Sequence, residues 1–168
     1  MTANKKPYEI PVVFLVAFML SIATNSLANE YESLTGVDAV KAVFDVRVAN
    51  PKVAAVHLDL IHKTFKDQNL TINSKKPDFV IIFMGPAVKL VSKARTGFTP
   101  EDQKQLDAIA GIIVDMAKDG IKLEICVAAV HLTGGDTASI LPEIKQVGNG
   151  WISAIGYQHK GYAIISDF

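Results

Sequence analysis

The residue with the clearest capacity for chemistry is Cys126, the single cysteine of a 168-residue chain. A thiolate is a strong nucleophile, and a lone cysteine cannot form an intramolecular disulfide. It is therefore a reactive thiol, a link to another chain, or a small buried side chain. His131 follows five residues later and is a candidate partner for the thiolate by ion pairing. Two ligands are too few for a zinc site, so we expect no metal centre here.

A turn predicted shortly after the cysteine favours a working thiol. Gly134, Gly135 and Asp136 form this turn within ten residues of Cys126, and Asp136 is a suitable cap for a helix that begins there. Backbone N–H groups at such a position attract anions and lower the pKa of a thiol nearby. We therefore predict that Gly134 and Gly135 contribute to substrate binding. The apolar neighbours of the cysteine favour the opposite interpretation, plain burial.

A basic segment after the second predicted strand is a second candidate for anion binding. Lys89, Lys93 and Arg95 lie in a stretch without acidic residues between Asp78 and Glu101. Placed near the mouth of a sheet, these cations would attract a small anion, and Lys89 is the candidate binding residue. The alternative is an ordinary solvated run of charges. The chain has no Walker or GxGxxG pattern, so we expect no cofactor.

The N-terminus has the pattern of a cleavable signal peptide. Lys5 and Lys6 precede the uncharged apolar run 10–23, and small residues stand at the −3 and −1 positions of a cut after Ala28. The run is shorter than the roughly 20 residues that a membrane span needs, so a retained anchor is the alternative. We predict a signal peptide over 1–28 and one mature domain over 29–168, periplasmic or secreted and not attached to the membrane.

Strands and helices alternate along this domain. The five predicted strands are rich in β-branched and aromatic residues and cover 40–48, 78–84, 121–130, 143–147 and 162–166. The range of the third strand includes the segment that leads out of it. The four predicted helices begin at caps or proline and cover 51–69, 100–119, a short segment after 136, and 150–160. The alternation predicts an α/β fold of three layers, α/β/α, with a five-stranded, mostly parallel open sheet. Because ligands of such sheets bind beyond the carboxyl ends of the strands, the place of Cys126 near a strand end also favours a working thiol.

Two stretches of this sequence resemble the DsrE/DsrF-like family of sulfur-relay proteins. The first, 120–129 (GIKLEICVAA), is similar to the strand that bears the persulfide-carrying cysteine of its DsrE and TusD-type members. The second is the C-terminal run with Leu141–Ile144, Val147, Gly150 and Gln158–Tyr162. The resemblance covers most of residues 38–168 and is most specific over 120–165.

The resemblance implies a function and an assembly. It implies a three-layer fold, trimers or hexamers of identical chains, and a thiol that accepts sulfane sulfur and passes it to an acceptor protein. By the family's motif, Cys126 is the active cysteine. Members that act in tRNA thiolation or dissimilatory sulfur oxidation are cytoplasmic, whereas this chain carries an export signal, which speaks against a role in tRNA modification.

Three functions therefore remain open. The leading hypothesis is an exported thiol carrier that holds sulfur as a persulfide on Cys126. The second is a non-catalytic oligomeric binding or assembly module in which Cys126 is buried and inert. The third is a small-molecule binding protein that uses Lys89 and Lys93. The formal net charge of zero is atypical of nucleic-acid binding, so we expect no nucleic-acid partner.

Overall fold

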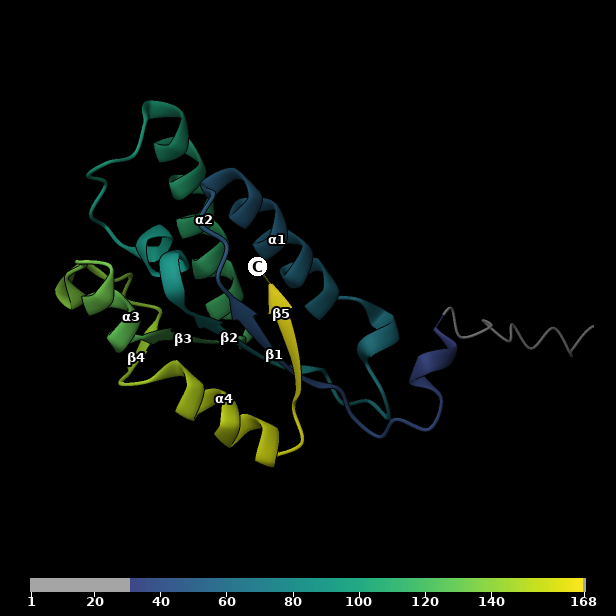
Figure 1. The fold of residues 1–168 in the computed structure, drawn as a ribbon. Helices are drawn as coiled ribbons and strands as arrows, with labels where there is room; N and C mark the ends of the chain where they lie inside the picture. Colours follow the sequence, from purple (N-terminus) through teal and green to yellow (C-terminus); the bar gives the residue numbers. More distant parts are fainter. Residues whose placement is uncertain (1–30, 168) are drawn as a thin grey trace, which may run out of the picture.

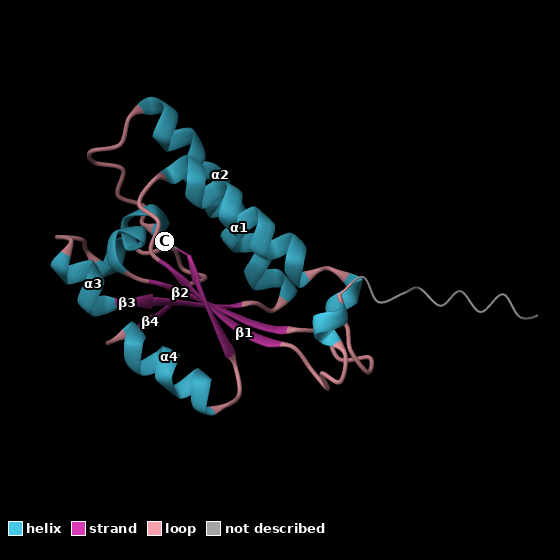
Figure 2. Ribbon diagram, turned by 45° about the vertical axis from the view of Figure 1, so that its right-hand side comes forward, coloured by secondary structure: helices cyan, strands magenta, loops and turns pink. Residues whose placement is uncertain are grey.

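Five parallel strands form one sheet at the centre of the protein (Figures 1 and 2). The computed structural model describes residues 31–167. The strands are β1 (Lys41–Val46), β2 (Asp78–Phe83), β3 (Lys122–Cys126), β4 (Lys145–Val147) and β5 (Ala163–Asp167). Their spatial order is β4-β3-β2-β1-β5, and each strand is parallel to its neighbours. The predicted α/β fold is confirmed, and the sheet is parallel throughout.

The helices divide between the two faces of the sheet as the strand order requires. Helices α1 (Pro51–Phe65) and α2 (Pro100–Asp119) lie side by side on one face, and α4 (Gly150–His159) lies on the other (Figures 1 and 2). Crossovers between parallel strands are right-handed. The connections β1–β2 and β2–β3 advance in one direction across the sheet, whereas α4 leads from β4 back to β5. The return therefore places α4 on the face opposite to α1 and α2.

The two long helices begin and end where local chemistry predicts. The side chain of Asn50 accepts a hydrogen bond from the backbone of Val53 at 3.1 Å, which caps α1. Thr99 and Asp102 form a reciprocal capping box at the start of α2. Gly120 ends α2 with a φ of 94°, a left-handed conformation in which glycine carries no Cβ penalty.

The third strand ends earlier than predicted. Cys126 is its last residue and pairs with Val147 of β4, the last aligned pair between those strands. Beyond this pair β4 offers no further partner, and the backbone N–H of Ala128 donates instead to the carbonyl of Gly148 at 3.1 Å. The following segment therefore forms the helix α3 (Val127–Leu132) rather than the extended strand exit that was predicted through Val130.

The core is densest along β2. Its residues Phe79–Phe83 are buried, as expected for the central strand of a sheet covered on both faces. At the amino-terminal edge of the sheet, where β2 begins, Asp78 accepts hydrogen bonds from Lys122 at 2.5 Å and from Tyr162 at 2.6 Å. Partial burial opposes ionisation of Asp78, but these two donors outweigh it and hold the pKa of its carboxyl below the usual value. This cluster joins β2, β3 and the residue that precedes β5, and it lies at the edge remote from Cys126.

Candidate functional site

Cys126 lines a small cavity at the carboxyl edge of the sheet. The cavity has a volume of about 180 Å³, and we call it the thiol cavity. Its lining is mostly apolar and consists of Arg47, Met84, Gly85, Cys126, Ala128, Ala129, Leu132, Asn149 and Trp151. Cys126 is buried, with 6% of its surface exposed, and it borders the thiol cavity.

Three of the lining residues are brought together by the register of the sheet. Val46 aligns with Phe83, and Phe83 aligns with Ile125. The next residues along the three strands are therefore at the same level, and they are Arg47, Met84 and Cys126. Side chains at one level of a parallel sheet point to the same face. In this case that face is the one covered by α4, at the carboxyl edge where open α/β sheets bind ligands.

The N-terminus of α4 forms one side of the thiol cavity. Asn149 caps this helix through a hydrogen bond from the backbone N–H of Trp151 at 2.9 Å. Gly150 packs so closely that a Cβ added there would lie 3.1 Å from the Cβ of Cys126 and 2.6 Å from the sulfur of Met84. The start of the ten-residue helix α4 is thus in contact with the cysteine, and the positive end of its dipole favours negative charge nearby.

Arg47 is the cation of this site. Its Nε and Nη2 donate to the carboxylate of Asp45 at 3.0 Å, a two-pronged ion pair. Its Nη2 is also 4.0 Å from the sulfur of Met84, the side chain that contacts Gly150 beside the cysteine. The guanidinium of Arg47, the thioether of Met84 and the thiol of Cys126 thus line the same cavity, with Met84 next to the guanidinium.

A buried carboxylate on the same strand fixes the position of α4. Glu124 is 4% exposed and lies two residues before the cysteine. It accepts hydrogen bonds from the hydroxyl of Ser153 and, at 3.1 Å, from the hydroxyl of Tyr157, both on α4. Burial and the negative charge of Glu124 raise the pKa of Tyr157 to about 12. These bonds hold α4, and with it Gly150, against the sheet.

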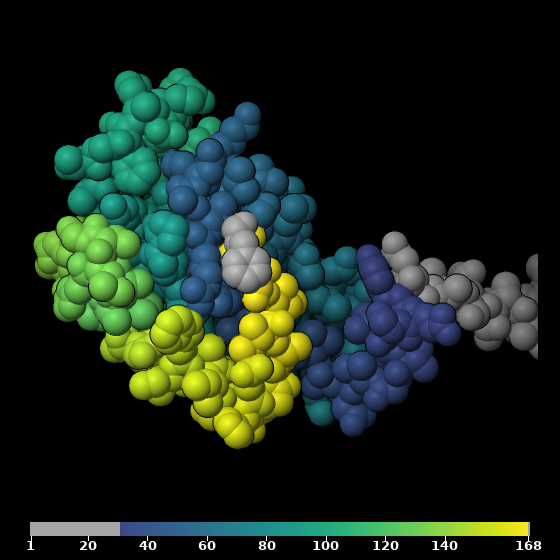
Figure 3. All heavy atoms as spheres, in the orientation of Figure 1, coloured from purple at the N-terminus to yellow at the C-terminus, as the bar shows by residue number. Residues whose placement is uncertain are grey.

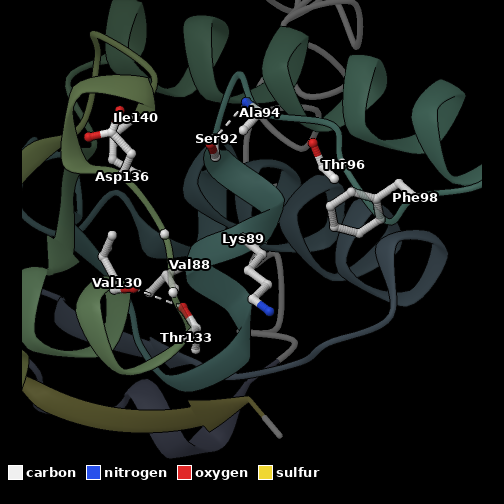
Figure 4. Close-up of a pocket in the computed structure, with 12 residues that line it drawn as sticks. Val88, Lys89, Ser92, Ala94, Thr96, Phe98, Val130, Thr133, Asp136 and Ile140 are labelled. Carbon is white, nitrogen blue, oxygen red and sulfur yellow. Dashed lines mark hydrogen bonds between the residues drawn. The ribbon is translucent and has the colours of Figure 1, made fainter.

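The other predicted binding residues lie in a second cavity. Lys89, Gly134 and Gly135 line a space of about 370 Å³, the Lys89 cavity, between α3 with its following turn and the segment 88–98 (Figure 4). Ser92, Phe98 and other side chains complete its lining. Cys126 is not among the lining residues. The structure therefore brings Lys89, Gly134 and Gly135 together, but it separates them from the thiol.

The glycine turn does not have the predicted relation to the thiol. The N–H of Gly134 donates to the carbonyl of His131 at 3.0 Å, and the N–H of Gly135 donates to the carbonyl of Val130 at 2.8 Å. Both groups are thus used to end α3 and do not point at a ligand. The helix predicted after Asp136 is a single 3₁₀ turn, Thr137–Ser139.

The remaining candidates lie outside both cavities. His131 is exposed on α3 and lines neither cavity. Lys93 is exposed, and Arg95 forms an ion pair with Asp107 at 3.2 Å. Over residues 31–167, no group of three or more His, Cys, Asp or Glu side chains is arranged to hold a metal ion.

Sequence reasoning missed Arg47, Met84 and Trp151 as site residues. The first strand was predicted to continue to Val48, which placed Arg47 inside it. In the structure β1 ends at Val46, so Arg47 is the first residue beyond its carboxyl end. The available signal was a charged residue directly after an apolar strand. Asn149 was identified as a helix cap, but nothing in its surroundings indicated which residues that helix would approach.

Comparisons with known proteins agree with this architecture. A sequence profile of the DsrE/DsrF-like family matches residues 41–166. An uncharacterized protein of Aquifex aeolicus is 25% identical over 126 residues, which cover 75% of this chain and 55% of that protein. The chain thus spans little more than half the length of that relative.

Two solved structures are also similar. The protein of unknown function MTH1491 from Methanobacterium thermoautotrophicum has a TM-score of 0.58 at 12% identity, over 76% of this chain and 98% of that one. The ychN protein from E. coli has a TM-score of 0.47 at 11% identity, over 77% and 99% of the two chains. The similarity to MTH1491 supports a shared fold.

Proposed function

The chain belongs to the DsrE/DsrF-like family, which is associated with sulfur relay, and we propose that it is a thiol carrier that accepts and passes sulfane sulfur through Cys126. The observation that carries the proposal is the placement of the single cysteine. It ends the inner strand β3, lines the thiol cavity, and touches the start of α4. A carrier needs a thiolate that small donors reach and that bulk solvent does not.

The proposed loading step is a displacement at sulfur. The Cys126 thiolate attacks the outer sulfur of thiosulfate, a new S–S bond forms, and the original S–S bond breaks. The electron pair of the broken bond leaves with sulfite, and Cys126 becomes a persulfide. In the unloading step an acceptor thiolate attacks the outer sulfur of the protonated persulfide, and Cys126 leaves as the thiolate. No external oxidant or reductant is consumed. The acceptor is another protein of the relay.

Intact mass spectrometry of the folded protein without residues 1–28 tests this function. After incubation with thiosulfate or polysulfide, we expect gains of single sulfur atoms. Prior alkylation is expected to prevent them, and so is Cys126→Ser, a change that leaves the cavity nearly unaltered in volume. A wild-type mass that stays the same with both donors would overturn the proposal.

Burial of the cysteine favours one alternative, a non-catalytic binding or assembly module with an inert thiol. At 6% exposure Cys126 resembles a core residue. In that case a thiol reagent labels Cys126 only after denaturant is added. The carrier proposal instead requires labelling of the native protein, so the same mass measurement separates the two functions.

We also propose that the carrier works outside the cytoplasm, periplasmic or secreted, after removal of the signal peptide. The support is the sequence pattern of 1–28, which lies outside the described residues. Within the described part of the chain, no helix is long and apolar enough to cross a bilayer. Export would require the sulfur donor and the acceptor thiol to be present in that compartment.

Self-association is the assembly that we propose, as a trimer or hexamer. Among the α-helices of residues 31–167, α4 alone covers its face of the sheet. It exposes Trp151, Ile152 and Ile155, with Ile152 70% exposed. Leu132 on α3 is also exposed, and α3 and α4 are adjacent on the surface in Figure 3. Because Trp151 and Leu132 line the thiol cavity, a partner seated here would border the opening of the thiol.

The variant Ile152→Asp is expected to shift the protein to monomers. Burial of an isoleucine contributes about 2 kcal/mol, so the charge should weaken each contact about thirtyfold or more. Sedimentation velocity measures the change. Val56→Asp, at an exposed aliphatic position of α1 on the opposite face of the sheet, is the matched control and should leave the assembly intact. A wild-type protein that sediments as a monomer would contradict this assembly.

A further inference from the structure

Arg47 is the charged member of the thiol cavity. Within the described part of the chain, nine residues line this cavity, and Arg47 alone among them carries a charge. The rest of the lining is apolar except for the amide of Asn149 and the thiol itself. The side chain of Arg47 is 30% exposed and borders an apolar wall, so water screens its charge less than it screens the charge of a fully exposed cation.

The guanidinium is held in a fixed orientation and keeps unused donors. Its Nε and Nη2 edge is fixed by Asp45, and its Nη2 is 4.0 Å from the sulfur of Met84. Within residues 31–167, its Nη1 donates to no other residue. An arginine side chain presents five N–H donors in a rigid plane, so the Nη1 end retains two donors for an external acceptor.

We propose that Arg47 makes the thiol cavity selective for anionic sulfur species. The substrate class is a small oxyanion with a terminal sulfane sulfur, such as thiosulfate, rather than a neutral disulfide. The inference rests on the proposed function for the sulfur itself, but the anion selectivity is a separate property of the cavity. Arg47 is thus a specificity-determining residue for the proposed loading step.

The chemistry of loading explains what Arg47 adds. An anionic donor approaches an anionic thiolate, and the guanidinium reduces the repulsion between them. The leaving sulfite also gains negative charge as the S–S bond breaks, and its oxygens are suitable acceptors for the N–H groups of Arg47. Asp45 weakens the field of Arg47 but lies on its Nε edge, so an oxyanion at Nη1 is nearer to the cation than to the carboxylate.

The alkylation rates of Cys126 by iodoacetate and by iodoacetamide test this selectivity in the folded protein. Both reagents attack the same thiolate and are similar in size, but only iodoacetate is anionic. Their rate ratio therefore cancels any change in the amount of thiolate. We expect Arg47→Gln to lower the ratio of the iodoacetate rate to the iodoacetamide rate about fivefold, the factor that corresponds to removing about 1 kcal/mol of attraction.

Three further variants make the result specific. Arg47→Lys should retain most of the ratio. Asp45→Asn should raise it, because this removes the opposing charge, and this variant tests the inference in the other direction should Arg47→Gln fail to fold. Arg95→Gln is the matched control, because Arg95 pairs with Asp107 and does not line the thiol cavity. Its ratio should equal that of the wild type.

The outcomes separate this inference from the proposed function. Equal ratios for the wild type and both Arg47→Gln and Asp45→Asn would overturn the selectivity, and so would a thiol that neither reagent reaches in the native protein. A ratio that depends on Arg47, together with a mass unchanged by thiosulfate and polysulfide, would leave an anion-selective cavity in a protein that carries no sulfur.

Discussion

The double variant Ser153→Ala/Tyr157→Phe is expected to have a free energy of unfolding about 3–5 kcal/mol lower than that of the wild type. It removes both hydroxyl groups that hydrogen bond to the buried carboxylate of Glu124. A hydrogen bond to a charged group contributes about 1.5–3 kcal/mol, and a buried charge without partners is among the most costly groups in a protein. Urea unfolding followed by circular dichroism measures the loss.

A third substitution shows that the carboxylate causes this loss. Glu124→Leu in the same double variant removes the charge that lost its partners, and we expect it to recover much of the stability. If the triple variant is as unstable as the double variant, the lost stability belongs to the packing of α4 and not to the hydrogen bonds. The comparison isolates the link that holds α4 beneath Cys126.

The high pKa of Tyr157 gives the same network a signature at alkaline pH. Its pKa is about 12 in the folded protein, above the usual value of about 10. A group with a raised pKa stabilises the fold below its unfolded pKa, and this contribution is lost as the pH rises from about 10 to 12. Tyr157→Phe should remove one tyrosine that ionises in this range, which ultraviolet absorbance detects.

The elements of the fold were largely predictable because their signals are local. The strand β2 is one continuous apolar run, and α1 and α2 begin at a cap followed by proline. Each signal lies within a few neighbouring residues. The place of Cys126 near the carboxyl end of the third strand was predicted, although that strand ends four residues earlier than expected. The spacing of strands and helices then implied the parallel sheet.

The candidate site was only partly predictable because its parts are distant in the sequence. The strand register places Arg47 and Met84 at the level of Cys126. The return of α4 across the opposite face of the sheet brings Gly150 against Cys126. No local pattern specifies which helix end approaches which strand end. The contacts depend on the topology as a whole.

The conformation of one short segment, which the sequence pattern did not settle, separates the two cavities. Residues 127–130 are apolar, and a short apolar run fits a strand exit or a buried helix equally well. The segment forms α3, whose six residues carry the chain about 9 Å along the helix axis. Gly134 and Gly135 therefore border the Lys89 cavity and not the thiol cavity.

The close approach at Gly150 leads to a result opposite to helix propensity. Alanine normally stabilises a helix relative to glycine by up to about 1 kcal/mol. At Gly150, however, a Cβ would be 2.6 Å from the sulfur of Met84 and 3.1 Å from the Cβ of Cys126. A separation of 2.6 Å is too short for any real contact, so Met84 or the start of α4 must move.

We therefore expect Gly150→Ala to destabilise the protein by about 1–3 kcal/mol, the usual cost of overpacking, and to slow alkylation of Cys126 because the displaced groups narrow the thiol cavity. Gly156→Ala is the matched control: Gly156 lies in the same helix, and a Cβ there meets no atom within 4 Å. It should stabilise the protein slightly and leave the alkylation rate unchanged. Equal stabilities for the two variants would mean that α4 does not press on Cys126, and the thiol would then be more open than the structure implies.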